Sequence, residues 1–272
     1  METLYKYITK HIDIDEEWDG HIHLFNHERP ISKKHNFEYC VGFMDIEYND
    51  LKYINVLDAY TDYIKNHWNK RSEILLATGI TIEDIKAVHE KYKNIIKGFG
   101  ELKCYDKYGD EKLPYKKIKL VRDVVKLSND NGKLPVYIHW ELETNKDVEK
   151  LENVLKLYPS VPLVLCHCGM NEINRDFAYQ ESIRLQRMYS NLWLDISWDA
   201  ADFFSNNFML LNNLILDRVI LGTDLNNVIF KKDRLHTDRD WKWGYDKFME
   251  LQKYMSISNK QKIKKLFKIG LS

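Results

Sequence analysis

Short apolar runs alternate along the chain with longer stretches in which apolar residues recur at helical spacing. The runs predict eight strands, over residues 18–25, 39–46, 74–78, 95–102, 135–140, 161–167, 192–197 and 218–223. Several are apolar without interruption, such as Leu163-Val164-Leu165, which is typical of strands buried on both faces of a sheet. The run at 74–78 is the least distinctive, because a short apolar run also fits a helix.

The stretches between these runs predict helices, most clearly over residues 81–92, 118–129, 147–157, 246–255 and 260–267. Thr81 is followed by Glu83 and Asp84, which is a typical helix start with an N-cap residue and acids in the first turn. Strands that alternate with helices predict a parallel sheet, and eight such units favour a closed (β/α)8 barrel, a TIM barrel, over an open sheet.

We expect one barrel domain over residues 1–272, because no linker or change of composition divides the chain. A barrel of this kind needs about 250 residues. The segment 4–11 predicts an extra N-terminal helix packed outside the barrel.

Charge and hydropathy narrow the classes of partner. Lys plus Arg and Asp plus Glu both number 41, so no global attraction to nucleic acid or to an anionic membrane is expected. No apolar run approaches the roughly 18 residues that span a bilayer, and the first residues lack the apolar stretch of a signal peptide. We therefore expect a cytoplasmic protein whose cysteines are reduced thiols, since four in a chain of this length do not form a disulfide scaffold.

The most distinctive local motif is Asp19-Gly20-His21-Ile22-His23, at the end of the first predicted strand. Side chains two residues apart on a strand point the same way, so His21 and His23 are aimed at one point. Taken alone, such a pair is better explained by two unrelated histidines, one of them in the core.

Three other predicted strands also finish on a residue type that binds metals. The fifth ends at His139, the sixth at His167, and the eighth leads into Asp224. The carboxyl ends of all barrel strands meet at one face, which carries the active site in enzymes of this fold. Together these strand ends predict a site where imidazole and carboxylate groups bind a divalent ion such as Zn²⁺.

These motifs, in this order, resemble the amidohydrolase superfamily of metal-dependent hydrolases, especially its amidohydrolase-related and TatD-like branches. The resemblance extends from about residue 18 to residue 226, and also includes Gly100-Glu101 on the fourth strand, Cys166-His167-Cys168-Gly169 on the sixth and Gly222-Thr223-Asp224 on the eighth. It implies that the metal ligands are His21, His23, Glu101, His139, His167 and Asp224. It also implies that Asp224 shuttles a proton, with His167 as the second catalytic residue.

The fourth strand offers two rival ligands. Glu101 matches the TatD-like glutamate that bridges two metals, whereas relatives with a carboxylated lysine carry that lysine on the same strand, where Lys103 has the same parity. We favour Glu101, because the Gly-Glu match is direct. The other interpretation is an ion pair of Glu101 and Lys103 at the rim of the barrel. The number of metal ions, one or two, stays open.

Loops after the strands are expected to surround the metal. We predict Lys103, Trp140, Ser197 and Trp198 as substrate contacts, with packing or solvated charge at the rim as the alternative. Asp195 shares the parity of Ser197 and is expected to face the barrel interior. Cys166 and Cys168 flank His167, so we expect them to point away from it and pack against the outer helices.

The function expected from this site is hydrolysis of an ester, lactone or amide in a small molecule. A TatD-like phosphoesterase or deoxyribonuclease is the first alternative, and it requires two metals and a basic groove. Leu102-Lys103-Cys104 replaces the usual TatD continuation after Glu101, which favours the amidohydrolase-related branch. A metal-dependent decarboxylase and a non-catalytic binding protein complete the alternatives, and a homo-oligomer remains open.

Overall fold

The structure is a computed structural model that describes residues 18–23, 39–43, 55–66, 68, 73–104, 115–170, 173, 175–226 and 246–269. Its strands are β1 (Trp18–His23), β2 (Tyr39–Phe43), β3 (Glu73–Ala77), β4 (Ile96–Lys103), β5 (Val136–His139), β6 (Leu163–Leu165), β7 (Leu192–Ile196), β8 (Val219–Leu221) and β9 (Leu225–Asn226). Neighbouring strands are parallel, in the order β8-β7-β6-β5-β4-β3-β2-β1-β9.

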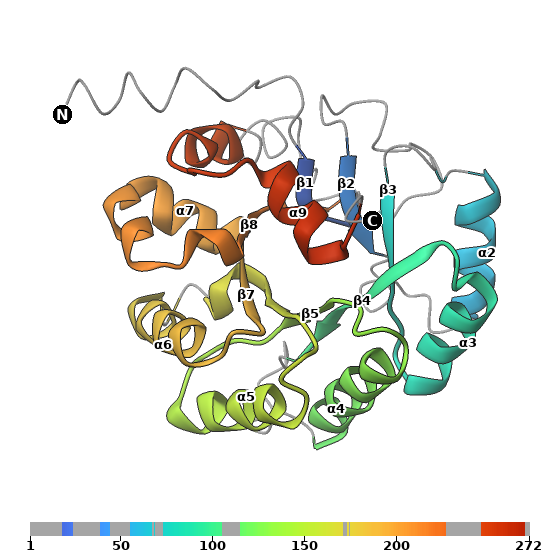
Figure 1. The fold of residues 1–272 in the computed structure, drawn as a ribbon. Helices are drawn as coiled ribbons and strands as arrows, with labels where there is room; N and C mark the ends of the chain where they lie inside the picture. Colours follow the sequence, from blue (N-terminus) through green and yellow to red (C-terminus); the bar gives the residue numbers. More distant parts are fainter. Residues whose placement is uncertain are drawn as a thin grey trace, which may run out of the picture.

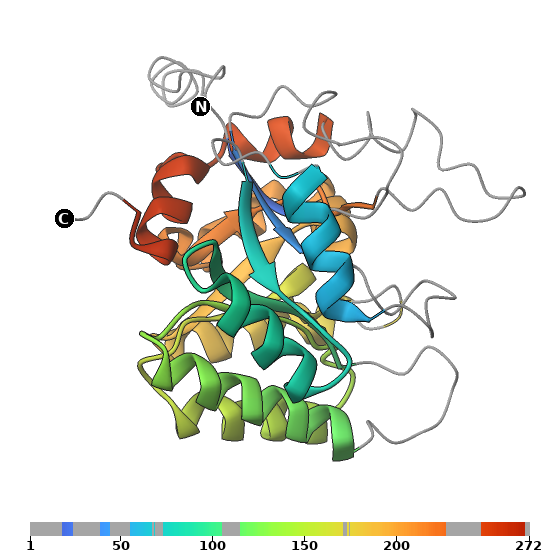
Figure 2. The same ribbon diagram turned by 90° about the vertical axis from the view of Figure 1, so that its right-hand side faces the viewer.

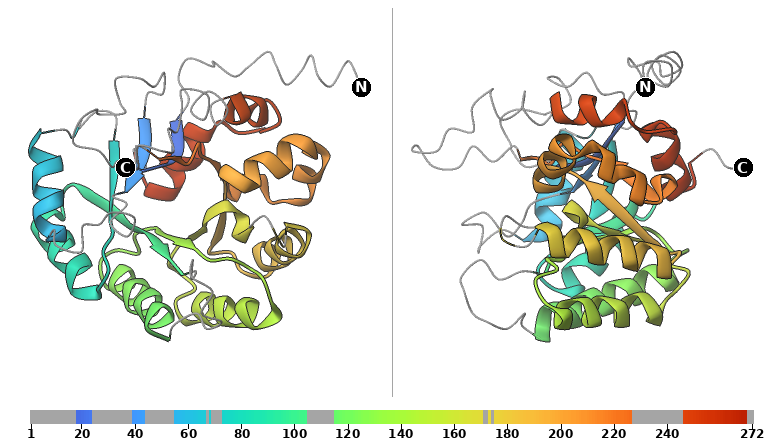
Figure 3. Two further views of the ribbon diagram at one scale, coloured as in Figure 1. Left: turned by 180° about the vertical axis from the view of Figure 1, so that it is seen from behind. Right: turned by 90° about the vertical axis from the view of Figure 1, so that its left-hand side faces the viewer.

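The helices that surround the strands are α2 (Val56–Asn66), α3 (Ile82–Tyr92), α4 (Tyr115–Asp130), α5 (Asn145–Leu157), α6 (Arg175–Met188) and α7 (Trp198–Asn206), and they form a ring around the barrel (Figures 1 and 3). A further helix spans residues 246–252, and α9 (Asn259–Phe267) lies across one end of the barrel (Figures 1 and 2). The predicted TIM-barrel architecture is therefore confirmed, and the run at 74–78 is a strand. The predicted helix at 4–11 lies outside the described residues.

The sequence correctly predicts the start of α3, but it does not predict the helix that follows the seventh strand. Thr81 is the N-cap of α3, and its side chain and that of Asp84 form a reciprocal capping box. The predicted loop after the seventh strand is wrong, because α7 starts directly at Trp198 with Ser197 as its N-cap residue. In the described part of the chain, no helix has both the length and the apolar character that crossing a bilayer requires.

The barrel closes between β8 and β1 with little strand pairing. β9 continues from β8 and pairs with the end of β1, and the backbone amide of Asp224 donates to the carbonyl oxygen of His21 at 3.0 Å. A Cβ on Gly222 would lie 2.3 Å from the Cβ of His21, so only glycine allows the two chains to approach this closely.

Two buried polar side chains form hydrogen bonds that join β1 and β8 at the same junction, and we call these bonds the clasp. Asp19 accepts hydrogen bonds from the backbone amides of His21 and Thr223, both at 3.0 Å. The side-chain amide of Asn259, on α9, donates to the carbonyl oxygens of Trp18 and Leu221, and its oxygen accepts from the amide of Leu221 at 2.8 Å. These bonds replace the missing ladder between β1 and β8.

Apolar side chains fill two layers. The larger layer lies between the strands and the outer helices and includes Phe99, Leu102 and Trp140. The smaller one contains the inward-facing residues of the strands together with α9; its buried members are Trp18, Val41, Ile74, Leu76, Tyr137, Val164, Cys166, Trp193, Ile220, Ile263 and Leu266. α9 therefore plugs one end of the barrel, and the polar site lies toward the other.

Candidate metal centre

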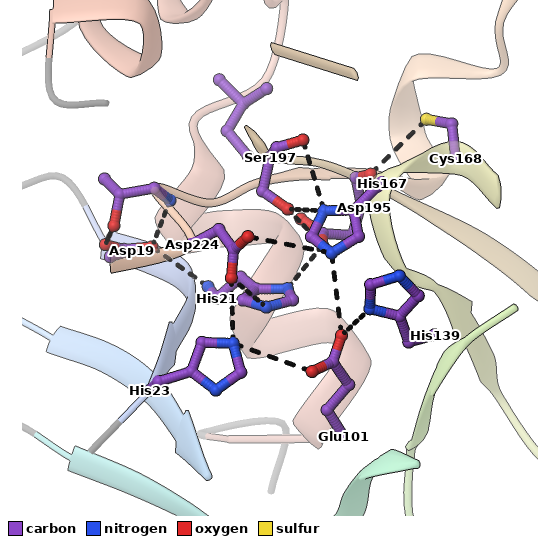
Figure 4. Close-up of polar contacts among 12 residues, drawn as sticks. Asp19, His21, His23, Glu101, His139, His167, Cys168, Asp195, Ser197 and Asp224 are labelled. Carbon is purple, nitrogen blue, oxygen red and sulfur yellow. Dashed lines mark hydrogen bonds and ion pairs between the residues drawn. The ribbon is translucent and has the colours of Figure 1, made fainter. Parts of the chain in front are cut away.

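Histidine and acidic side chains from separate strand ends converge at the carboxyl end of the barrel (Figure 4). His21 and His23 come from β1, Glu101 from β4 and His139 from β5. His167 lies in a short 3₁₀ turn, Cys166–Gly169, directly after β6, and Asp224 lies between β8 and β9. Three overlapping groups have ligand atoms within 4.8 Å of one another: His21, His167 and Asp224; His21, His23 and Glu101; and Glu101, His139 and His167.

Asp224 lies among three of the histidines. Its Oδ1 atom is 2.9 Å from Nε2 of His23 and 3.1 Å from Nε2 of His21, and its Oδ2 atom is 3.8 Å from Nε2 of His167. The backbone of Asp224 is left-handed, with φ of 53°, a conformation that Asp adopts more readily than most residues. The carboxylate is the most solvent-accessible of the acids in the cluster, with 14% of its side chain exposed, so it can meet both an ion and a substrate.

Glu101 lies between two sets of histidines. Its Oε1 atom is 2.8 Å from Nδ1 of His139 and 3.7 Å from Nε2 of His167, while Oε2 is 3.7 Å from Nε2 of His23. Oε2 is buried and has no hydrogen-bond partner among the described residues. A cation on that side would satisfy this oxygen, whose burial without a partner is otherwise unfavourable.

Lys103, the rival ligand, is only partly buried and pairs in the sheet with His139. Its charge opposes protonation of His139, so it lies close to the cluster. The structure places the carboxylate of Glu101, with 2% of its side chain exposed, among the ligand histidines. This position supports Glu101 as the ligand and does not support a rim ion pair for it.

The carboxylates control the pKa values of the histidines. Burial alone would lower the pKa of His21, but Asp195 and Asp224 outweigh it and raise that pKa well above its ordinary value. Burial likewise opposes protonation of His139, yet Glu101 raises its pKa to about 9.

The two acids are affected in the opposite direction. Burial would raise the pKa of Glu101 and Asp224, but His139 holds the pKa of Glu101 well below its usual range, and His21 and His167 do the same for Asp224. Both carboxylates therefore stay ionised. Imidazoles with ionised carboxylates are a donor set that suits Zn²⁺ and similar divalent ions, so these residues fit a metal centre.

Strand β7 contributes two residues behind the histidines. Oδ2 of Asp195 is 2.6 Å from Nδ1 of His21, and the hydroxyl of Ser197 donates to the same Oδ2 at 2.7 Å. The parity argument placed Asp195 correctly inside the barrel, but no sequence signal linked it to His21. Ser197 is fully buried in this network, so the prediction that it contacts substrate is wrong.

Two other predicted substrate contacts, Trp140 and Trp198, differ in their exposure to solvent. Trp140 is fully buried in the outer apolar layer, because His139 points into the barrel and the next side chain on the strand points out. The prediction for Trp140 is therefore also wrong. Trp198, the first residue of α7, is 43% exposed and stays a candidate contact.

The turn after β6 corrects the prediction for Cys166. The strand ends at Leu165, and His167 and Cys168 both have φ of 53°, so strand alternation does not continue. Cys166 faces the barrel interior with Tyr137 and lies in a group with His21 and Asp195, whereas Cys168 packs in the outer layer as predicted. Burial raises the pKa of the Cys166 thiol well above its ordinary value, so the group is a neutral thiol.

Comparison with known proteins agrees with this fold. Residues 129–255 match the family model described as amidohydrolase. No curated protein matches the sequence.

Solved structures share the fold over nearly the whole chain. A candidate 2-pyrone-4,6-dicarboxylic acid hydrolase from Pseudomonas putida has a TM-score of 0.58 at 13% identity, covering 95% of this chain and 99% of its own. An amidohydrolase from Burkholderia multivorans with bound zinc has a TM-score of 0.58 at 9% identity, covering 93% and 99%. A TatD homolog from Escherichia coli has a TM-score of 0.58 at 14% identity, covering 94% and 96%.

The solved structures show that the class of fold is the TIM barrel. The chain is similar to the amidohydrolase family over residues 129–255, in agreement with the resemblance that its strand-end motifs carry.

Proposed function

We propose that this protein is a metal-dependent hydrolase that activates water to cleave an ester, lactone or amide bond in a small molecule. The observation that carries this proposal is the convergence of four histidines and two ionised carboxylates on the carboxyl face of the barrel; the residues are His21, His23, Glu101, His139, His167 and Asp224. The family match and the zinc in one neighbour of the same fold support it.

Each residue has a role in this proposal. The four histidines, Glu101 and Asp224 would hold the metal. A bound divalent ion acidifies water and polarises the bond to be cleaved. Asp224, which is ionised and partly accessible, would accept a proton from the attacking water and pass it to the leaving group. His167, whose Nε2 faces the carboxylate of Asp224, would hold that end of the site.

A second candidate is phosphoester hydrolysis, and the position of Glu101 favours it. One oxygen of Glu101 faces His139 and His167 while the other faces His23, as expected for a carboxylate that bridges two ions. Paired ions are common in phosphatases and nucleases. They also occur in hydrolases of other bonds, so bridging alone does not choose the substrate.

A substrate panel tests the proposal. Protein reconstituted with Zn²⁺ or Mn²⁺ is assayed against activated esters, lactones, anilides and a phosphodiester, beside an Asp224→Asn variant. We expect metal-dependent turnover of a carboxyl derivative that is lost in the variant. Turnover confined to the phosphodiester would support the second candidate instead. Turnover that survives in the variant would contradict the role of Asp224.

A further inference from the structure

A chain of hydrogen bonds through β7 connects two histidines that come from different strand ends of the barrel (Figure 4). Nδ1 of His21 is 2.6 Å from Oδ2 of Asp195, and the hydroxyl of Ser197 is 2.7 Å from that same oxygen. The hydroxyl oxygen of Ser197 is in turn 2.9 Å from Nδ1 of His167. One carboxylate thus contacts His21 directly and His167 through a hydroxyl.

The directions of these bonds follow from what each group can donate. An ionised carboxylate only accepts, so Nδ1 of His21 and the Ser197 hydroxyl both donate to Asp195. The single proton of Ser197 is then used, and its oxygen can only accept from Nδ1 of His167. The carbonyl oxygen of Ser197, at 3.4 Å from the same Nδ1, is also an acceptor and favours the same arrangement.

In the neutral form that binds a metal, both histidines therefore carry their proton on Nδ1 and direct Nε2 into the site. The Nε2 atoms of His21 and His167 both face the carboxylate of Asp224, at 3.1 and 3.8 Å, and they share a group of potential ligands with it. Asp195 and Ser197 are fully buried, so solvent does not compete for these bonds. The network selects the tautomer and holds the rings, as groups behind metal-bound histidines commonly do.

We propose that Asp195 and Ser197 are positioning residues that fix the Nδ1–H tautomer of His21 and His167 and hold both Nε2 atoms for one metal ion. This inference rests on the proposed metal-dependent function. It gives β7, a strand from which no ligand is proposed, a defined part in the site.

Zinc affinity, measured by competition with a chromogenic chelator, gives the first test. Asp195→Asn leaves one acceptor oxygen where two donors now converge, and we expect affinity to fall about 10- to 100-fold. Ser197→Ala removes the hydroxyl between Asp195 and His167 but keeps the contact between Asp195 and His21, and we expect a smaller fall. Ser128→Ala is the matched control, because Ser128 is a buried serine whose hydroxyl donates to a carbonyl of an outer loop, that of Leu134. It should lower stability without changing zinc affinity.

Nitrogen-15 NMR of labelled histidine side chains in the zinc-loaded wild-type protein gives the second test, which needs no variant to fold. We expect His21 and His167 to be protonated at Nδ1 and coordinated through Nε2. Ser197→Ala should change the signals of His167 and leave those of His21 in place, which a merely structural role would not predict.

The outcomes distinguish a failure of the positioning role from a failure of the proposed metal-dependent function. Coordination of either histidine through Nδ1, or variants that bind zinc as tightly as the wild type, would overturn the positioning role alone. A wild-type protein that binds no zinc would contradict the proposed function itself.

Discussion

At one end of the barrel, inward-facing apolar side chains pack against α9, and at the other end the same strands present histidines and acids. β5 shows the change within three residues, because Tyr137 belongs to the apolar interior and His139 to the candidate metal site. β6 and β8 repeat it, passing from Val164 to His167 and from Ile220 to Asp224. The apolar end stabilises the fold by removing hydrocarbon from water, whereas the polar end buries charged groups that are unfavourable without partners.

This comparison predicts that substitutions at the two ends affect different quantities. Changes in the polar end should reduce activity and metal binding with little loss of stability, since sites built for function are often not optimal for folding. Changes in the apolar end should reduce stability and leave the activity of each folded molecule intact.

The largest effect is expected from Asp224→Asn. The variant keeps the shape of the side chain but cannot accept a proton from water, so kcat should fall by about 10²- to 10⁴-fold. The midpoint of thermal unfolding should fall less than in a variant of the apolar end, because only the pairing of Asp224 with His21 and His167 is lost. Steady-state kinetics with saturating metal measures kcat, and circular dichroism measures the midpoint of thermal unfolding. A strong loss of stability with unchanged kcat would reverse the roles of the two ends.

Leu266→Ala is the counterpart at the plugged end. Leu266 is 2% exposed and packs with the inward-facing strand residues, so the cavity left behind should lower the free energy of unfolding by about 2 to 5 kcal/mol. Denaturant unfolding measures this value. Zinc content and kcat per folded molecule should match the wild type, and a parallel loss of both would show that α9 also supports the site.

The pH dependence of the metal-free protein sharpens the description of the polar end. The pKa of His139 is raised from 6.5 to about 9, so its protonated form stabilises the fold below 6.5, and that contribution is lost as the pH rises toward 9. Burial raises the pKa of Asp19 to about 7, so its ionisation also disfavours the fold as the pH increases. At low pH, the fold loses stability as Glu101 and Asp224 become protonated, because the pKa values of both acids are lowered in the folded state.

Thermal unfolding from pH 6 to 9.5, with and without zinc, tests this expectation. The metal-free protein should lose stability as the pH rises. The zinc-loaded protein should not show this loss, because metal binding needs deprotonated histidines and strengthens with pH. Identical profiles for the two forms would contradict the placement of these histidines at the metal.

The smallest effect is expected from Asn259→Ala, which removes the clasp of the β1–β8 junction. The backbone groups of Trp18 and Leu221 would lose their side-chain partners in a buried position, which should lower the free energy of unfolding by about 1 to 3 kcal/mol. Lys265→Ala, on the same helix but with an exposed side chain that takes no part in the clasp, is a control for helix α9. Equal unfolding curves for the two variants would show that the clasp contributes little.

Much of the fold was predictable because the strands are marked by local chemistry. Continuous apolar runs such as 163–165 and 219–221 identify strands buried on both faces, and Thr81 with its following acids identifies a helix start. α6 was missed because its buried face carries Ser182 and Gln186, which interrupt the apolar repeat. α7 was interpreted as a loop because it begins directly after β7 without a connecting turn.

In the site, ligand types at strand ends were visible in the sequence, but their supporting contacts were not. Asp195 and His21 are 174 residues apart in the chain, and nothing local to either predicts their hydrogen bond. Parity placed Asp195 inside correctly, yet it failed at Cys166–Gly169, where two left-handed residues end the alternation. The predicted directions of side chains therefore agree with the structure where the strands are regular and fail where the chain turns.

Metal content per chain tests the central claim most directly. It is measured by elemental analysis after reconstitution with zinc or manganese, on the wild type, on Glu101→Gln and on a His21→Ala/His23→Ala double variant. The account predicts bound metal in the wild type, less in Glu101→Gln, and loss of the ion that the β1 histidines hold in the double variant. Two equivalents that fall to one would support a bridging Glu101. A wild-type protein that takes up no metal, or a double variant that takes up as much as the wild type, would contradict the account.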